Sequence, residues 1–192
     1  VASNVNSAAN GTGAAQLDNI TTAAGGTISV TTAAGGSNAG GSITQTAATL
    51  LNSGAGGPGA LSTSTGGASS IGLIGAKILT TADTITASAG SGGVFITETD
   101  GASFTATATG AGAINLTSTS GTLTIAGATN SGTGTITLSS GDAIAISAAL
   151  GDATDGAITI NANTVGADAA GFSQGAAGSI MEQAPTGTGQ ML

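Results

Sequence analysis

The sequence contains no cysteine, histidine, tryptophan or tyrosine, and its 192 residues include one basic side chain, Lys77. General acid–base catalysis, nucleophilic triads and most transition-metal sites draw on the side chains that are missing. A disulfide scaffold is excluded as well. We therefore expect the chain not to be an enzyme, and to have no cofactor and no metal centre.

Basic charge is almost absent, while nine acidic residues bring the formal net charge to −8. Proteins that bind the phosphate backbone of nucleic acids need a basic surface, so nucleic acid is not an expected partner. No run approaches the roughly 18 to 20 consecutive apolar residues of a membrane-spanning helix. The sequence therefore predicts no membrane insertion.

Large apolar and charged residues are both scarce: aromatic residues make up 2% of the chain and charged residues 5%, whereas glycine occurs 35 times. Few large apolar residues are typical of disorder, but disordered chains usually combine that scarcity with high charge. Composition alone does not distinguish a disordered chain from a folded one. The positions of the aliphatic residues have to decide.

A five-residue phrase, Gly-x-Ile-x-(Ile or Leu), returns at regular intervals in the second half of the chain. It stands at residues 112–116, 134–138 and 156–160, and residues 178–180 open in the same way, so its isoleucines are evenly spaced. Extended backward at shorter intervals, the series predicts about nine turns of roughly 15 to 22 residues. The first predicted column contains Ile28, Ile43, Leu61, Ile78, Ile96, Ile114, Ile136, Ile158 and Ile180.

Two further columns of apolar residues follow the first at similar intervals. Residues 121–125 and 142–146 alternate apolar with small or polar side chains, which is typical of half-buried strands. Three columns per turn predict a triangular cross-section. The second column contains Ile85, Phe104, Leu123, Ile144 and Val165, and the weaker third one contains Ala128, Leu150 and Phe172.

The fold predicted from these columns is all-β: a right-handed parallel β-solenoid, or triangular β-helix. Clusters of Gly, Ser, Asn and Thr between the columns supply turns, and frequent glycine with β-branched residues disfavours helix. Right-handed coiling is the steric default, and neighbouring turns would lie about 4.8 Å apart. The predicted segments are residues 1–24, an irregular leading segment or partial first turn; 25–183, the repeats; and 184–192, a connecting tail.

The repeated phrases, with Gly41-Ser-Ile-Thr-Gln45 and Gly121-Thr-Leu-Thr-Ile125 among them, resemble the repeats of filamentous haemagglutinin-type bacterial exoproteins over roughly residues 25–183. The resemblance implies a secreted protein, placed outside the cell or on the bacterial surface, that serves adhesion, biofilm cohesion or carriage of a distal tip. The sequence departs from that family in lacking an Asn-Pro-Asn-Gly type segment of the secretion domain.

The acidic residues raise the question of calcium. Asp152 and Asp155 flank one turn, and Glu98 and Asp100 stand beside another. Calcium takes six to eight oxygen ligands, and the tandem nonapeptides of calcium-binding β-rolls are absent, so ordinary turn chemistry is favoured while calcium at Asp152 and Asp155 stays open. The glycines of residues 90–93 lack the lysine of a phosphate-binding loop and are interpreted as turn residues.

Two functions are compatible with such a solenoid. The first is a structural shaft of an adhesin or filament, which associates end to end or continues into further repeats because uncapped ends leave strand edges and core open, and which contacts a host or biofilm surface. The alternative is a surface-binding module for carbohydrate or ice. Carbohydrate is disfavoured because Trp and Tyr are absent. An ice-binding face would use the outward pairs Thr84/Thr86, Ser103/Thr105 and Thr122/Thr124, and it would be interrupted at Ala143/Ala145.

Lys77 is the one basic residue of the chain, and we expect it on a solvated face and not in a binding site.

Overall fold

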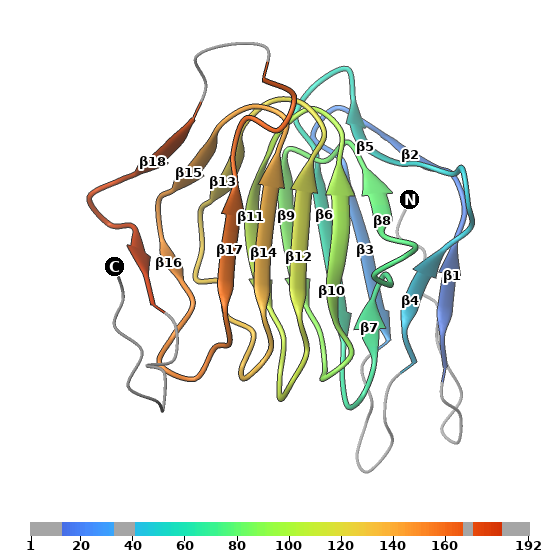
Figure 1. Cartoon of the computed structure of the whole chain (residues 1–192). Helices are drawn as coiled ribbons and strands as arrows, with labels where there is room; N and C mark the ends of the chain where they lie inside the picture. Colours follow the sequence, from blue (N-terminus) through green and yellow to red (C-terminus); the bar gives the residue numbers. More distant parts are fainter. Residues whose placement is uncertain (1–12, 33–40, 167–170, 182–192) are drawn as a thin grey trace.

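The computed structural model describes residues 13–32, 41–166 and 171–181. Over these residues the chain forms strands, turns and irregular segments and no helix, and its strands stack side by side as the turns of a parallel β-solenoid (Figure 1). All paired strands run parallel; the antiparallel contact is an isolated bridge between Leu73 and Ala76. The predicted all-β, parallel class is confirmed.

Two large sheets and a narrow third face surround the core. The ten-stranded sheet contains β1 (Ala15–Leu17), β2 (Ile20–Ala23), β4 (Ile43–Gln45), β5 (Leu51–Ala55), β7 (Ser70–Ile71), β8 (Ile78–Thr80), β10 (Gly93–Glu98), β12 (Ile114–Ser118), β14 (Ile136–Ser140) and β17 (Ile158–Asn161). The seven-stranded sheet contains β3 (Thr27–Thr32), β6 (Ala60–Thr65), β9 (Thr84–Ser88), β11 (Ala102–Thr107), β13 (Leu123–Ile125), β15 (Ile144–Ile146) and β18 (Phe172–Gln174). The third face contains β16 (Ala149–Leu150) and β19 (Ser179–Ile180).

The described residues make seven turns, one for each strand of the seven-stranded sheet, and not the nine that the sequence predicted. The excess arose because the backward series mixed two faces. Ile28 pairs directly with Leu61 in the seven-stranded sheet, whereas Ile43 pairs with Ile71 in the ten-stranded sheet. Early turns are therefore longer than the middle ones, and the first one already includes β1 and β2, before residue 25.

The core of the middle turns consists of fully buried aliphatic columns. Ile114 pairs with Ile136, and Ile136 with Ile158, so the constant interval between these residues in the sequence corresponds to one turn. Ile114 and Ile136 are fully buried. Alternation along each strand puts one set of side chains in the core and the other on the outer surface, as period-two patterning dictates.

Two of the predicted column steps are shifted in the middle turns. Ile96 pairs with Ile78 on one side, but with Leu116 on the other, where the sequence suggested Ile114. The cause is strand length, because β10 begins at Gly93 and Val94 occupies the position opposite Ile114. Leu123 likewise lies opposite Ala102, so that Ile125 is the residue that pairs with Phe104, which itself pairs with Ile85.

The last turn departs most from the predicted columns. Val165 lies in a turn with 66% of its surface exposed, and Phe172 takes the position opposite Ile144 that the spacing had given to Val165. The chain between β17 and β18 is longer than the corresponding connection in earlier turns. Ile180 consequently pairs with Leu150 on the third face, not with Ile158, and Thr129 takes the place expected for Ala128.

Candidate functional site

A column of buried polar side chains lines the corner between the ten-stranded and seven-stranded sheets. Glu98 lies opposite Thr80 on one side and Ser118 on the other, and Ser118 lies opposite Ser140. All four are at most 1% exposed. Two of the hydroxyls donate hydrogen bonds to backbone carbonyls: Thr80 to the Leu51 carbonyl (2.9 Å), and Ser140 to the Gly121 carbonyl (2.9 Å).

Glu98 is the titratable member of this polar column. Its carboxylate accepts hydrogen bonds from the backbone N–H of Asp100 (2.8 Å), from the N–H of Gly101, and from the Ser118 hydroxyl (3.2 Å). Burial raises the pKa of Glu98 from 4.5 to about 7; the neighbouring Asp100 carboxyl adds to the rise, and the two N–H donors oppose it. From the sequence, Glu98 was interpreted as an acid beside a turn, and its burial was not predicted.

Asp155 fills a second corner, between the third face and the ten-stranded sheet. It is completely buried, and its oxygens accept from the backbone N–H of Ser131, from the Ser131 hydroxyl (2.5 Å) and from the N–H of Asp152. Asp152 accepts from the hydroxyl and N–H of Thr154, and these bonds hold its pKa below the usual value. Both acids thus fasten turns, and the described residues contain no group of three or more acids, histidines or cysteines placed to hold a metal ion.

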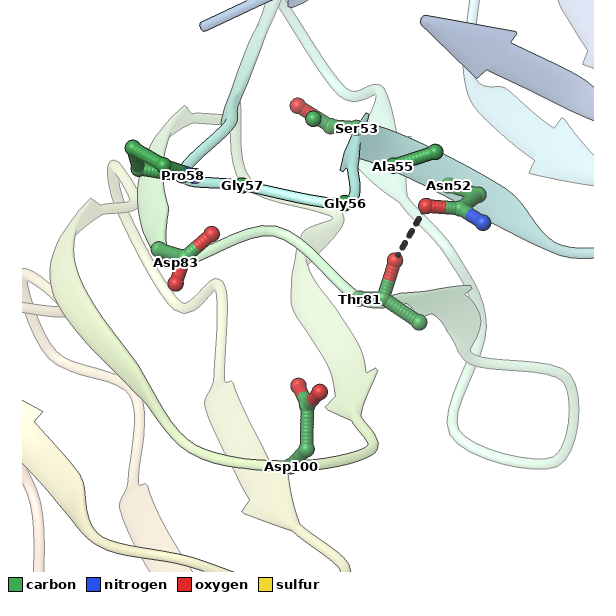
Figure 2. A pocket seen from close by; sticks show the side chains of 10 residues that line it. Asn52, Ser53, Ala55, Gly56, Gly57, Pro58, Thr81, Asp83 and Asp100 are labelled. Carbon is green, nitrogen blue, oxygen red and sulfur yellow. Dashed lines mark hydrogen bonds between the residues drawn. The ribbon is translucent and has the colours of Figure 1, made fainter. Parts of the chain in front are cut away.

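An open pocket of about 500 Å³ lies where the loop after β5 meets the corners before β9 and β11 (Figure 2). Asp83 and Asp100 reach it from successive turns. Asp83 accepts from the Gly59 N–H (2.9 Å), and the Thr81 hydroxyl donates to Asn52 (3.0 Å). The Asp83 carboxylate and the Asn52 amide are therefore already hydrogen-bonded within the protein. Asp100 is the other acid that lines the pocket.

Lys77 extends across the outer surface of the ten-stranded sheet. Its ammonium donates to the side-chain oxygen of Asn115 (2.8 Å) and to the hydroxyl of Thr117 (2.7 Å), both on β12. Lys77 is half-buried, and this desolvation lowers its pKa. Lys77 thus lies on an outer face, where the sequence placed it, but its side chain is only partly exposed and fastens the loop between β7 and β8 to β12, two turns further on.

The outer surface of the seven-stranded sheet carries the hydroxyl side chains that the sequence had singled out, but in a different register. Thr84 and Thr86 lie opposite Ser103 and Thr105 as expected. Thr124, however, lies opposite Ser103 and not Thr105, so the predicted third pair is displaced by two residues. The rows of outward side chains extend instead onto β6 and β3, where inward and outward residues alternate in the same way along residues 60–65 and 27–32, respectively.

No family model, curated protein or solved structure matches this chain. The resemblance to filamentous haemagglutinin-type repeats thus stays a prediction based on the repeated phrases. Among the described residues there is no helix of the length and hydropathy needed to cross a bilayer. The geometry of the chain itself has to support any functional conclusion.

Proposed function

We propose that this chain is a structural length of β-solenoid: a shaft, outside the cell or on a bacterial surface, that associates end to end or continues into further repeats. Solenoid turns bury their core mainly against their neighbours, so such a molecule gains stability as turns are added. A long object made of equivalent turns suits a spacer or filament better than a compact binding domain.

The last described turn is the observation that carries this proposal. It keeps the register of an interior turn, because Phe172 lies opposite Ile144 and Ile180 opposite Leu150. The two interior partners are fully buried, whereas Phe172 is 49% and Ile180 41% exposed. One more turn, from the same chain or from another, would cover both side chains and would pair the edges of β18 and β19 that no described strand pairs.

The polar chemistry of the chain also favours a structural role. Glu98 and Asp155 use their oxygens to hold corner backbone, and Lys77 holds a loop. Each of these groups has protein partners of the kind that buried polar groups require. In the part of the chain that the structure describes, they form no convergent set of acid, base and nucleophile.

End-to-end association can be tested by putting charge on the open turn. A Phe172→Glu/Ile180→Glu variant should stay monomeric in light scattering and electron microscopy, while the unchanged protein forms rods longer than one chain. A Ser173→Glu/Ser179→Glu variant is the matched control, since it places equal charge on the outer side of the same two strands and should associate normally. Rods that form equally well with both variants, or a wild type that is monomeric at all concentrations, would rule out this contact.

A further inference from the structure

The outer surface of the seven-stranded sheet carries a regular array of hydroxyl groups. Three outward positions on each of four neighbouring strands lie in register and form twelve sites, of which eleven are Thr or Ser. We call this array the hydroxyl grid. Its rows are Thr27–Ala60–Thr84–Ser103, Ser29–Ser62–Thr86–Thr105 and Thr31–Ser64–Ser88–Thr107.

The spacing of the grid is fixed by the backbone. Neighbouring strands lie about 4.8 Å apart and alternate residues about 6.6 Å apart, so the hydroxyls repeat in two directions. Six of the eleven hydroxyls belong to Thr, whose χ1 is restricted, so these six are limited in the positions they can take; the other five belong to Ser. On β13 the first row continues to Thr124, opposite Ser103, whereas the second row meets Gly127, where a Cβ would collide with the Thr105 side chain.

The hydroxyls of the grid are available to an external partner. Between described residues, one side-chain hydrogen bond lies within the grid, from Thr107 to Ser88 (3.3 Å). All twelve side chains are exposed or half-buried. Each free hydroxyl can donate one hydrogen bond and accept others.

The chemistry of the grid limits what this partner can be. No charged residue belongs to it, so an ionic partner finds no counter-charge. No aromatic or large aliphatic residue belongs to it either, and these are the residues that anchor protein interfaces and stack on sugars. The outer surface of the ten-stranded sheet differs, since the Lys77 ammonium lies on Asn115 and Thr117 there.

We infer that the hydroxyl grid orders water and adsorbs to the surface of ice. Water is uncharged, matches hydroxyls as both donor and acceptor, and as a solid presents its own two-dimensional repeat to the repeat of the grid. The threonine methyl groups between the hydroxyls limit the alternative positions that bound water can take. This activity is independent of end-to-end association, because the grid lies on the side of the solenoid and not at its last turn.

Adsorption to growing polycrystalline ice tests the inference. The protein should be enriched in the ice fraction relative to an equal concentration of an unrelated acidic protein. Thr86→Tyr, at the centre of the grid, should lower the bound fraction at least tenfold. Thr137→Tyr places the same bulk on the outer side of β14 and should leave binding within twofold of wild type.

Circular dichroism and melting temperature establish that both variants are folded, and Thr86→Val provides a second test that keeps the shape of the side chain while removing its hydroxyl. Reduced ice binding by Thr86→Val supports a role for the hydroxyls. The inference is overturned if the wild type is not enriched in ice, if Thr86→Tyr binds as wild type does, or if the protein binds crystalline cellulose or chitin and not ice.

Discussion

The first three turns and the middle turns build similar cross-sections from different lengths of chain. In the middle, β10, β12 and β14 are continuous strands, and core residues repeat at nearly constant intervals, as from Val94 to Ile114 to Ile136. In the first turns the same sheet is divided into pairs of short strands, and a much longer stretch of chain separates Ile28 from its partner Leu61. The parallel pairing of strands is therefore kept along the whole stack, while the number of residues per turn varies.

β10 joins the two regions, and it shows how the extra chain is accommodated. Val94 lies opposite Ile71 and Ile96 opposite Ile78, so one short step along β10 spans the whole connection from β7 to β8 in the turn before it. The surplus forms the loop that leads to Lys77. Gly72 makes this possible, since its φ is +69° and a Cβ there would collide with the Phe95 carbonyl oxygen.

The largest predicted effect tests whether the middle turns depend on unbroken apolar columns. Ile136→Asp would bury a carboxylate between Ile114 and Ile158, at a cost of several kcal/mol. Chemical denaturation should show most of the stability lost, while Thr137→Asp, the outward neighbour, changes it little. Equal effects of the two substitutions would mean that Ile136 does not lie in the core.

An intermediate effect is expected where the two regions meet, at Glu98. Its pKa is raised to about 7 in the folded protein, so the native state binds the proton more tightly than the unfolded chain does. This contribution to stability is complete below about pH 4.5 and is lost as the pH rises through 7, by about 3 kcal/mol in total. Glu98→Gln should flatten the profile of melting temperature against pH in this range. Asp18→Asn, in an exposed connection, is the control and should preserve the profile. Identical slopes in wild type and Glu98→Gln would contradict the raised pKa of Glu98.

The smallest effect concerns packing in the first turns. Thr63 points into the core between Val30 and Ala87, and its buried hydroxyl has no hydrogen-bond partner among the residues that the structure describes. Thr63→Val keeps the shape and removes the unsatisfied group, so stability should rise by about 1 kcal/mol. Thr65→Val on the same strand should be destabilising, because the Thr65 hydroxyl bonds the Ser69 carbonyl and the Gly90 N–H (both 3.4 Å). A loss of stability in Thr63→Val would contradict this account.

Much of the fold could be predicted from the phrases around Ile114, Ile136 and Ile158, because regular turns put equivalent residues at a constant interval. The early turns could not, since loops of different length separate residues that are partners in space, as with Ile28 and Leu61. The buried acids were missed for a related reason. Glu98 and Asp155 resemble ordinary turn residues in the sequence, and their burial follows from corner backbone donors that converge only after stacking.

The direction of pairing in the stacked turns has a mechanical consequence. The hydrogen bonds between turns run along the axis of the solenoid, so a pull on its two ends loads them one turn after another instead of all together. Each middle turn that peels away frees about 22 residues, which extend by about 70 Å. Under tension, a solenoid of this kind would lengthen in discrete steps and dissipate force while the remaining turns stay wound.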